Sequence, residues 1–465
     1  MPQKFRKRIR GVPRRRIRGV PRRRIRGVPR RSGPALLAAA CISALVLAGC
    51  QRKGIEELVS SELFSLSMGK MEDQIDLFQF ENAMVERANS LAMRDGWFYV
   101  ANGSAGKIMV FSSYGDLIFL LYNPQTNPAP TTLGPADVNA PAAGSSGDRG
   151  AESAGAESAG YGGAESAGYG GAVSTRGFVA YPFTDIGHIA VASDRTLYVE
   201  DAVSEAKAVK DTDRGVTRSR VILRFDRKGR QLGPLGEEGI GGSPFPYVSA
   251  LYVTSNDQLV VVCRLPGSWQ VFWYSRDGAP LYQVEVSNGN LPAKPQRGIT
   301  PALLSMFPDL QSPLLYLVIS SYKDAVDARS ATPADNDVVT TRAYKLDLRT
   351  QQYSPGFVEF PTNPPHRTKA GLKTIEIPSP PSDVLGVSSG GYFYLLAYTD
   401  TNLYTLQIVD PSGRVRAQRR VVIEDSELTF RDIHLSSTGI IYGLLADKAK
   451  AHVSWWRSDL LLKGE

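Results

Sequence analysis

The chain has 465 residues, 42% of them hydrophobic, and a formal net charge of +8. This length and composition suffice for a large hydrophobic core. The positive charge is confined to the N-terminus: residues 1–49 hold fifteen Lys and Arg residues and no acid, which leaves 39 basic and 46 acidic residues in 50–465. A net charge of −7 on that part excludes the basic footprint of a nucleic-acid-binding domain, so we expect no nucleic-acid partner.

Three identical copies of RIRGVPRR fill residues 8–31. A signal peptide needs only a few positive charges before its apolar core, and identical octads are typical of a short tandem duplication in the coding DNA. We therefore interpret the repeat as part of a leader or as misassigned upstream sequence, with translation starting inside or after it. A genuine long basic leader is the alternative.

An apolar run at residues 35–47 follows the repeat and is shorter than the ~20 residues that span a bilayer. Basic residues before it and small residues after it are typical of a secretory signal peptide. The ending LAGC, at residues 47–50, resembles the lipobox of bacterial lipoproteins. That resemblance implies cleavage before Cys50 and a diacylglycerol, with acyl chains such as palmitate, on the Cys50 thiol. The alternative is a buried N-terminal helix that ends in an incidental cysteine.

The lipobox resemblance predicts an envelope protein that reaches the membrane through its lipid. Residues 1–49 are then the basic leader and signal peptide, and residues 50–61 the lipid-anchored tether, with some helical character. Gln51 replaces the Asp that is associated with inner-membrane retention in enteric bacteria. We therefore expect an outer-membrane location, on the periplasmic face or at the surface, and an unidentified envelope protein or ligand as partner.

Cys263 is the remaining cysteine after Cys41 in the leader and Cys50 in the lipobox. One thiol cannot form an internal disulfide, so the exported domain must be stabilised by its core. The apolar run LVVVC at residues 259–263 predicts that this cysteine is a small buried hydrophobic residue and not a reactive thiol.

A segment rich in Pro, Ala, Gly and Ser occupies residues 124–176 and contains GAESAGYG twice in succession at 155–170. So few large apolar side chains cannot offset the entropy lost on ordering the backbone. The composition therefore predicts a disordered insertion within the domain. An inert spacer and an adhesive or antigenic loop are the two interpretations of its role.

The rest of the chain, residues 62–465, repeats short strands rich in Val, Ile, Leu, Tyr and Phe, bounded by Gly, Asp, Asn and Pro. A turn followed by an apolar strand occurs at 94–103, 193–202, 255–264, 312–321, 389–398 and 437–446. A strand, a turn and the start of another strand follow at 108–117, 222–231, 271–280, 343–352, 406–415 and 452–461. Gly229, Gly278 and Gly413 supply the positive φ that tight hairpins need. A further short strand precedes some units, as at 188–192, 249–253 and 432–436. Four short antiparallel strands repeated six times predict an all-β, six-bladed β-propeller.

The first unit, DGWFYVANGSAGKIMVFSSYGDL at residues 95–117, resembles an NHL repeat, and the second, at 194–229, resembles it less closely. The later units are degenerate. This resemblance likewise implies a six-bladed β-propeller, over residues 85–465. A lipobox followed by a divergent propeller is also similar to lipoproteins of spirochaetes.

The sixth unit lacks an outer strand, because few residues follow Trp456. LFSLSM at residues 63–68 alternates apolar residues with serine, which is the pattern of a half-buried strand. We expect this strand to pair near residues 452–462 and to close the ring, so that no sheet edge stays exposed.

Little in the sequence points to catalysis. The four histidines are far apart, and there is no metalloprotease motif, nucleophile elbow or phosphate-binding loop. We therefore expect no catalytic residue and no cofactor besides the covalent lipid, and hence a non-catalytic scaffold that binds a protein or a ligand. Arg414, Arg416 and Arg420 form a further candidate partner site, with a solvated strand face as the alternative.

The alternative function rests on three acids, Asp185, Asp383 and Asp432, each just before the expected first strand of a blade. That strand lines the central channel of a propeller. Three carboxylates at the channel mouth would suit Ca²⁺, which prefers oxygen ligands, as in six-bladed gluconolactonase-type enzymes. The alternative function is therefore a Ca²⁺-dependent hydrolase or lactonase. Hydrogen bonds from these carboxylates to nearby turn N–H groups are the simpler interpretation.

Overall fold

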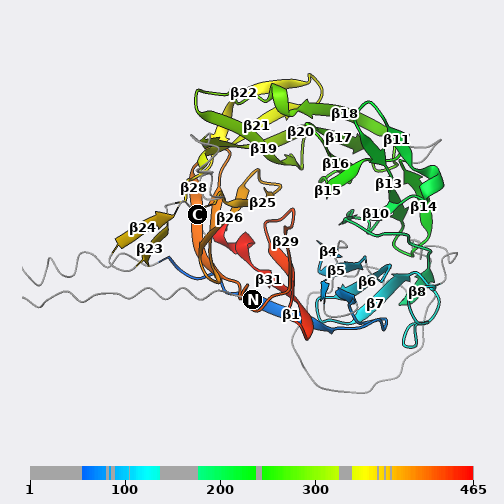
Figure 1. Cartoon of the computed structure of the whole chain (residues 1–465). Helices are drawn as coiled ribbons and strands as arrows, with labels where there is room; N and C mark the ends of the chain where they lie inside the picture. The colour runs from blue at the N-terminus through cyan, green and yellow to red at the C-terminus, as the bar shows by residue number, and fades with distance from the viewer. Residues whose placement is uncertain are drawn as a thin grey trace, which may run out of the picture. The chain divides into compact units, whose positions relative to one another are not determined.

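Six sheets, here called blades 1 to 6, are arranged around a central axis, and each has four antiparallel strands, to which blade 1 adds a fifth (Figure 1). The structure is a computed structural model, and residues 55–465 form one compact unit. It describes residues 55–79, 83–84, 89–103, 105–136, 176–236, 243–323, 338–363, 366–370, 373–377 and 380–463. The predicted leader, Cys50 and the GAESAGYG copies lie outside the described residues. The described part contains no helix long and apolar enough to cross a membrane.

Blades 1 to 3 come from the first half of the described chain. Blade 1 consists of β4 (Asn89–Arg94), β5 (Trp97–Asn102), β6 (Lys107–Ser112), β7 (Leu117–Tyr122) and a fifth strand, β8 (Gly177–Ala180), parallel to β7. Blade 2 consists of β9 (Ile189–Val191), β10 (Leu197–Ala202), β13 (Arg220–Phe225) and β14 (Gln231–Leu235). Blade 3 consists of β15 (Tyr247–Val253), β16 (Leu259–Leu265), β17 (Ser268–Tyr274) and β18 (Pro280–Ser287).

Blades 4 to 6 follow the same order, with one exception in blade 6. Blade 4 consists of β19 (Ile299–Pro308), β20 (Leu314–Lys323), β21 (Val338–Asp347) and β22 (Gln352–Glu359). Blade 5 consists of β25 (Asp383–Val387), β26 (Phe393–Asp400), β27 (Leu403–Val409) and β28 (Val415–Val422). Blade 6 consists of β29 (Phe430–Leu435), β30 (Ile441–Ala446), β31 (Lys450–Trp456) and β1 (Ser61–Ser67). The predicted all-β, six-bladed propeller is confirmed.

Smaller elements decorate the blades. Three two-stranded sheets pair β2 (Phe78–Gln79) with β3 (Ala83–Met84), β11 (Val209–Asp211) with β12 (Val216–Arg218), and β23 (His366–Ala370) with β24 (Lys373–Ile377). Short 3-10 turns are η2 (Glu205–Lys207), η3 (Asn288–Asn290) and η5 (Ser458–Leu462).

The hydrophobic core is divided among the junctions between neighbouring blades. Each of the six clusters of buried apolar side chains draws mainly on two adjacent blades. Cys263 is fully buried in the cluster between blades 2 and 3, and burial raises the pKa of its thiol. The prediction that it is a small buried hydrophobic residue is confirmed.

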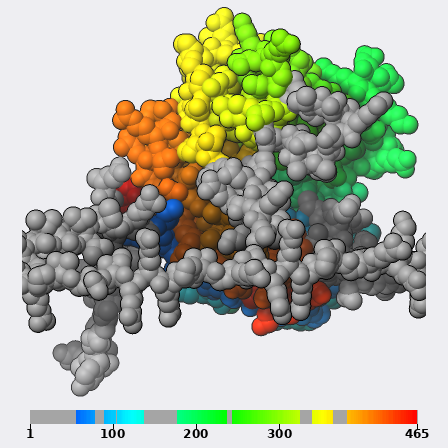
Figure 2. All heavy atoms as spheres, turned by 60° about the vertical axis from the view of Figure 1, so that its left-hand side comes forward, coloured from blue at the N-terminus to red at the C-terminus, as the bar shows by residue number. Residues whose placement is uncertain are grey.

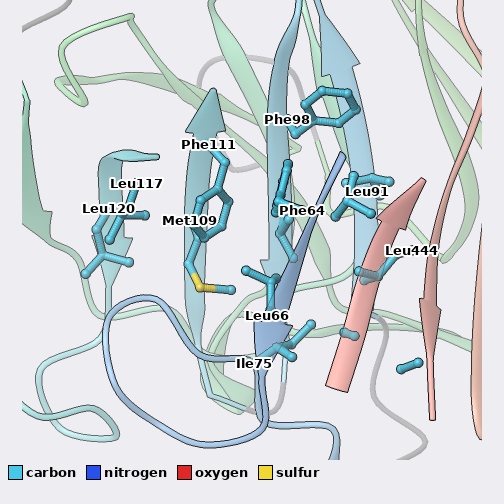
Figure 3. Close-up of a cluster of buried hydrophobic side chains, with 14 of the residues drawn as sticks. Phe64, Leu66, Ile75, Leu91, Phe98, Met109, Phe111, Leu117, Leu120 and Leu444 are labelled. Carbon is cyan, nitrogen blue, oxygen red and sulfur yellow. The ribbon is translucent and has the colours of Figure 1, made fainter. Parts of the chain in front are cut away.

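The ring closes through the N-terminal strand. β1 pairs antiparallel with β31, and Phe64 lies opposite Val453. Phe64 also contacts blade 1, because its ring lies 5.8 Å from that of Phe98 and 5.1 Å from that of Phe111 (Figure 3). The predicted closing strand is confirmed.

The N-terminal residues before β1 are extended and belong to the propeller. Leu58 N–H donates to the carbonyl oxygen of Arg420 at 2.8 Å, and Arg420 N–H donates to that of Glu56 at 2.9 Å. The expected helical character of the tether is wrong for residues 55–60, because the open edge of β28 offers backbone partners instead. Figure 2 shows these first described residues, in blue, beside the orange strands of blade 5.

The arginines of β28 also have partners within the chain. Arg420 pairs with Glu57 at 3.0 Å and Arg416 with Asp410 at 2.8 Å. These ion pairs favour a structural role for the two side chains over the partner site that the sequence left open.

The loop after β1 is tied to blade 1. Lys107 of β6 is fully buried and its Nζ donates to the carbonyl oxygens of Lys70 and Met71, at 3.2 and 2.6 Å. Burial lowers the pKa of Lys107 to about 8. The carboxylate of Glu72 in this loop accepts from the N–H groups of Thr131 and Thr132, both at 2.9 Å.

The start of the predicted insertion is therefore structured. Residues 124–136 follow β7 directly, and Ala136 N–H donates to the carbonyl oxygen of Phe178 at 2.9 Å. The expected boundary at residue 124 is too early, because Leu133 is buried in the cluster between blades 6 and 1. Residues 137–175, with the GAESAGYG copies, lie outside the described residues.

The glycine turns between the third and fourth strands of a blade pack against the preceding blade. Gly229, Gly278 and Gly413 have φ of +80°, +91° and +86°, as predicted. A Cβ on Gly229 would lie 2.6 Å from Cζ of Phe119 in blade 1. Glycine is therefore needed at this turn for two reasons: it adopts the positive φ without strain, and its lack of a Cβ leaves room for Phe119.

Replacing Gly229 with alanine tests this contact. Gly267 is a matched control, because its φ is +81° and a Cβ there would meet no atom within 4 Å. Both changes strain the left-handed backbone, but only Gly229→Ala also overpacks the blade junction, so we expect it to lower the free energy of unfolding by about 1–3 kcal/mol more than Gly267→Ala. Urea unfolding measures both; equal losses would contradict the packing role.

Candidate functional site

A cavity of about 390 Å³ lies at the propeller axis. The innermost strand of every blade contributes to its wall: β4, β9, β15, β19, β25 and β29. The size falls within the range of roughly 300–1,000 Å³ that is typical of ligand pockets. The axial cavity is therefore the candidate functional site.

Most residues that line the cavity are hydrophobic, but about half of the exposed wall is polar, from backbone groups, hydroxyls, a guanidinium and imidazoles. Leu251 and Phe307 represent its apolar part, and Ser249 its hydroxyls. Arg94, His188 and His434 also line it. Among the described lining residues there is no Asp and no Glu.

His188 is held by a buried carboxylate of blade 2. Its Nδ1 lies 2.8 Å from Oε2 of Glu200, which also accepts the His188 N–H at 2.9 Å. Glu200 is 4% exposed on β10, and Nε of Arg220 lies 3.4 Å from its Oε1. The carboxylate fixes the ring orientation, so that Nε2 remains as the second polar atom of the ring.

His434 is held in the same way by Asp432 of its own strand. Its Nε2 lies 2.6 Å from Oδ2 of Asp432, and its ring stacks on that of Tyr442 with centroids 5.6 Å apart. Oδ2 of Asp432 also accepts the Leu91 N–H of blade 1 at 3.1 Å. Burial by itself would lower the pKa of His434, but the charge and the hydrogen bond of Asp432 raise it above its ordinary value.

The three acids that the sequence proposed as calcium ligands do not converge. Asp185 pairs with Arg220 at 2.9 Å, Asp383 is exposed at the start of β25, and Asp432 holds His434. None of them lines the axial cavity. In the part of the chain that the structure describes, no group of three or more His, Cys, Asp or Glu side chains is placed to hold a metal ion. The three carboxylates therefore do not form the shared site that the alternative function would need.

Sequence reasoning missed the residues that give the cavity its polar character. His188 and His434 lie in segments correctly predicted as innermost strands, yet the histidines were considered only as zinc ligands and rejected for their spacing. A polar aromatic residue on a channel strand was the usable signal. Glu200 gave a second signal, because it and Asp201 are carboxylates inside a strand whose other residues are Leu, Tyr, Val and Ala.

The comparisons with known proteins establish no family for this chain. No protein-family model matches the sequence, and no curated protein matches it. The NHL and spirochaetal resemblances stay predictions. Structural similarity is found to hydrazine synthase of Kuenenia stuttgartiensis (10% identity, TM-score 0.38, 85% of this chain and 95% of that one). It is also found to a gluconolactonase from Xanthomonas campestris (9%, 0.35, 87% and 99%) and to a streptogramin B lyase (12%, 0.30, 79% and 92%).

His434→Gln tests the pair with Asp432 through pH. Because the folded-state pKa of His434 lies above 6.5, the charged pair stabilises the fold fully below pH 6.5 and loses this effect as pH rises through the folded-state pKa. The variant should therefore be less stable than the natural chain at about pH 5.5, and the difference should shrink by about pH 9. Urea unfolding at both pH values measures this; a deficit that does not change with pH would contradict it.

Proposed function

We propose that this chain is a lipid-anchored envelope protein whose β-propeller binds a ligand or protein without catalysing a reaction. The observation that carries the proposal is the axial cavity, which has the size of a ligand pocket and a wall built from all six blades. Apolar surface with a few fixed polar groups is typical of binding pockets.

A Ca²⁺-dependent hydrolase is the less favoured function. Such an enzyme would need six to eight oxygen ligands around the ion, several of them carboxylates. Asp185 and Asp432 are each engaged by a cationic or imidazole partner, and neither lies in the cavity wall.

The lipid anchor is proposed from the sequence at Cys50. Residues 51–54 separate this cysteine from Ile55, and the chain joins the edge of β28 directly afterwards. A lipid on Cys50 would therefore be attached only a few residues before a segment that is hydrogen-bonded into the propeller. We place the protein at the outer membrane, with an envelope protein or a ligand as its partner.

Metabolic labelling tests the anchor. The full chain is expressed in a bacterium supplied with radiolabelled palmitate, beside Cys50→Ala and the matched control Cys41→Ala. We expect label on the natural chain and on the Cys41 variant, and none on the Cys50 variant, because the lipobox cysteine alone carries the lipid. Label that persists in Cys50→Ala, or is absent from the natural chain, would contradict the anchor.

Calorimetric titration of residues 51–465 with Ca²⁺ separates the two functions. This fragment contains every described contact. We expect no saturable heat, and the same result for the triple variant Asp185→Ala, Asp383→Ala, Asp432→Ala, because the three carboxylates lie apart. Tight binding that the triple variant loses would favour the hydrolase instead.

A further inference from the structure

Apart from the neutral phenols of Tyr252 and Tyr442, the titratable side chains in the axial cavity wall are all basic. Arg94, His188 and His434 line it, and no carboxylate does so among the described residues. The two acids that orient the imidazoles, Glu200 and Asp432, are not part of the wall. A cationic ligand would therefore meet no counter-charge in this wall, whereas an anion would meet a guanidinium.

Arg94 is poorly paired within the protein. Its side chain is 21% exposed, and its Nε lies 3.7 Å from the carboxylate of Asp95, which is 68% exposed. The Nε is buried, and no group of the described residues accepts its hydrogen. A buried donor without an acceptor is costly, so its presence at a cavity wall points to an acceptor that comes from a ligand.

Arg94 and His434 lie at the same end of the cavity. The innermost strands β4 and β29 belong to adjacent blades, and Arg94 is the last residue of β4 while His434 is the last but one of β29. Tyr442, on which His434 stacks, is hydrogen-bonded to the backbone of Met93. One nitrogen of His434 is bound to Asp432, so Nδ1 is the atom left for a group in the cavity.

The part of the wall that blades 3, 4 and 5 contribute consists mainly of hydrophobic residues. It includes Ala250 and Val253 of blade 3 and Leu385 of blade 5, which are partly exposed, with the hydroxyl of Ser249 among them. A ligand that fills about 390 Å³ and satisfies both parts of the wall carries an acidic group and an apolar body.

We propose that the axial cavity binds a small organic anion, with its acidic group at Arg94 and His434 and its apolar body against the inner strands of blades 3 to 5. This inference rests on the proposed ligand-binding function and adds the chemical class of the ligand. Arginine suits this role because its planar N–H groups match the geometry of an oxyanion.

Two fluorescent probes with the same aromatic skeleton test the inference. 1-Anilinonaphthalene-8-sulfonate carries a sulfonate, and N-phenyl-1-naphthylamine lacks it. We expect residues 51–465 to bind the sulfonate at one saturable site, at least tenfold more tightly than the neutral probe. Arg94→Met, or Arg94→Gln if the first variant does not fold, should weaken the sulfonate at least tenfold and leave the neutral probe within twofold.

A second experiment blocks the cavity with a large side chain. Ser249→Phe places a large side chain at the cavity wall, whereas Gln283→Phe places the same side chain on the exposed outer strand β18. We expect the first variant to lose both probes and the second to keep both, with circular dichroism confirming that each is folded. Ser437→Phe, also at the wall, replaces Ser249→Phe if that variant does not fold.

The outcomes separate the inference from the proposed function. Equal affinity for both probes, unaffected by Arg94→Met but lost in Ser249→Phe, would overturn the anion and leave ligand binding in place. Sulfonate binding that survives the blocked cavity would overturn the site. No binding of either probe would overturn both the inference and the cavity as a ligand site.

Discussion

The pairing of β1 with β31 is the contact on which the rest of the structure depends. Each blade packs only against its neighbours, so the ring needs a closing contact between blades 6 and 1. β1 supplies it by completing blade 6 through backbone hydrogen bonds and by burying Phe64 and Leu66 in the junction with blade 1 (Figure 3). An unclosed blade 6 would leave the edge of β31 exposed, which natural sheets avoid.

The same closure creates the axial site. β29 and β4 are the last and first of the innermost strands, and they become neighbours only when the ring closes. Across this junction the Leu91 N–H reaches Asp432, Asp432 holds His434, and Arg94 lies at the same end of the cavity. The proposed anion-binding end of the cavity therefore forms only when the ring closes. Weakening the pairing of β1 with β31 should disturb this site as well as the fold.

The N-terminal segment, from residue 55 through the loop after β1, connects three blades. It contacts blade 5 through residues 55–58, blade 6 through β1, and blade 1 through the loop that Lys107 holds. In the proposed lipoprotein, residues 51–54 would separate this segment from the lipid on Cys50.

Local patterns in the sequence predicted the strands, the glycine turns and the closing strand, because these depend on periodicity and on φ at single residues. The site depends on which inner-strand residues lie next to one another on different blades. That arrangement is set by contacts between residues far apart in the sequence, which local patterns do not reveal. Asp185 and Asp383 were therefore proposed together yet lie apart, whereas Arg94 was not singled out. The tether at residues 55–60 was misjudged because a free strand edge outweighs weak helical propensity.

Hydrogen exchange of β1 under native conditions tests the central claim most directly. The account predicts that the amides of Phe64 and Leu66 exchange as slowly as those of β30 and β31, because opening β1 opens the ring. Fast exchange in β1 beside full protection in the rest of blade 6 would show that the strand is dispensable and would contradict the account.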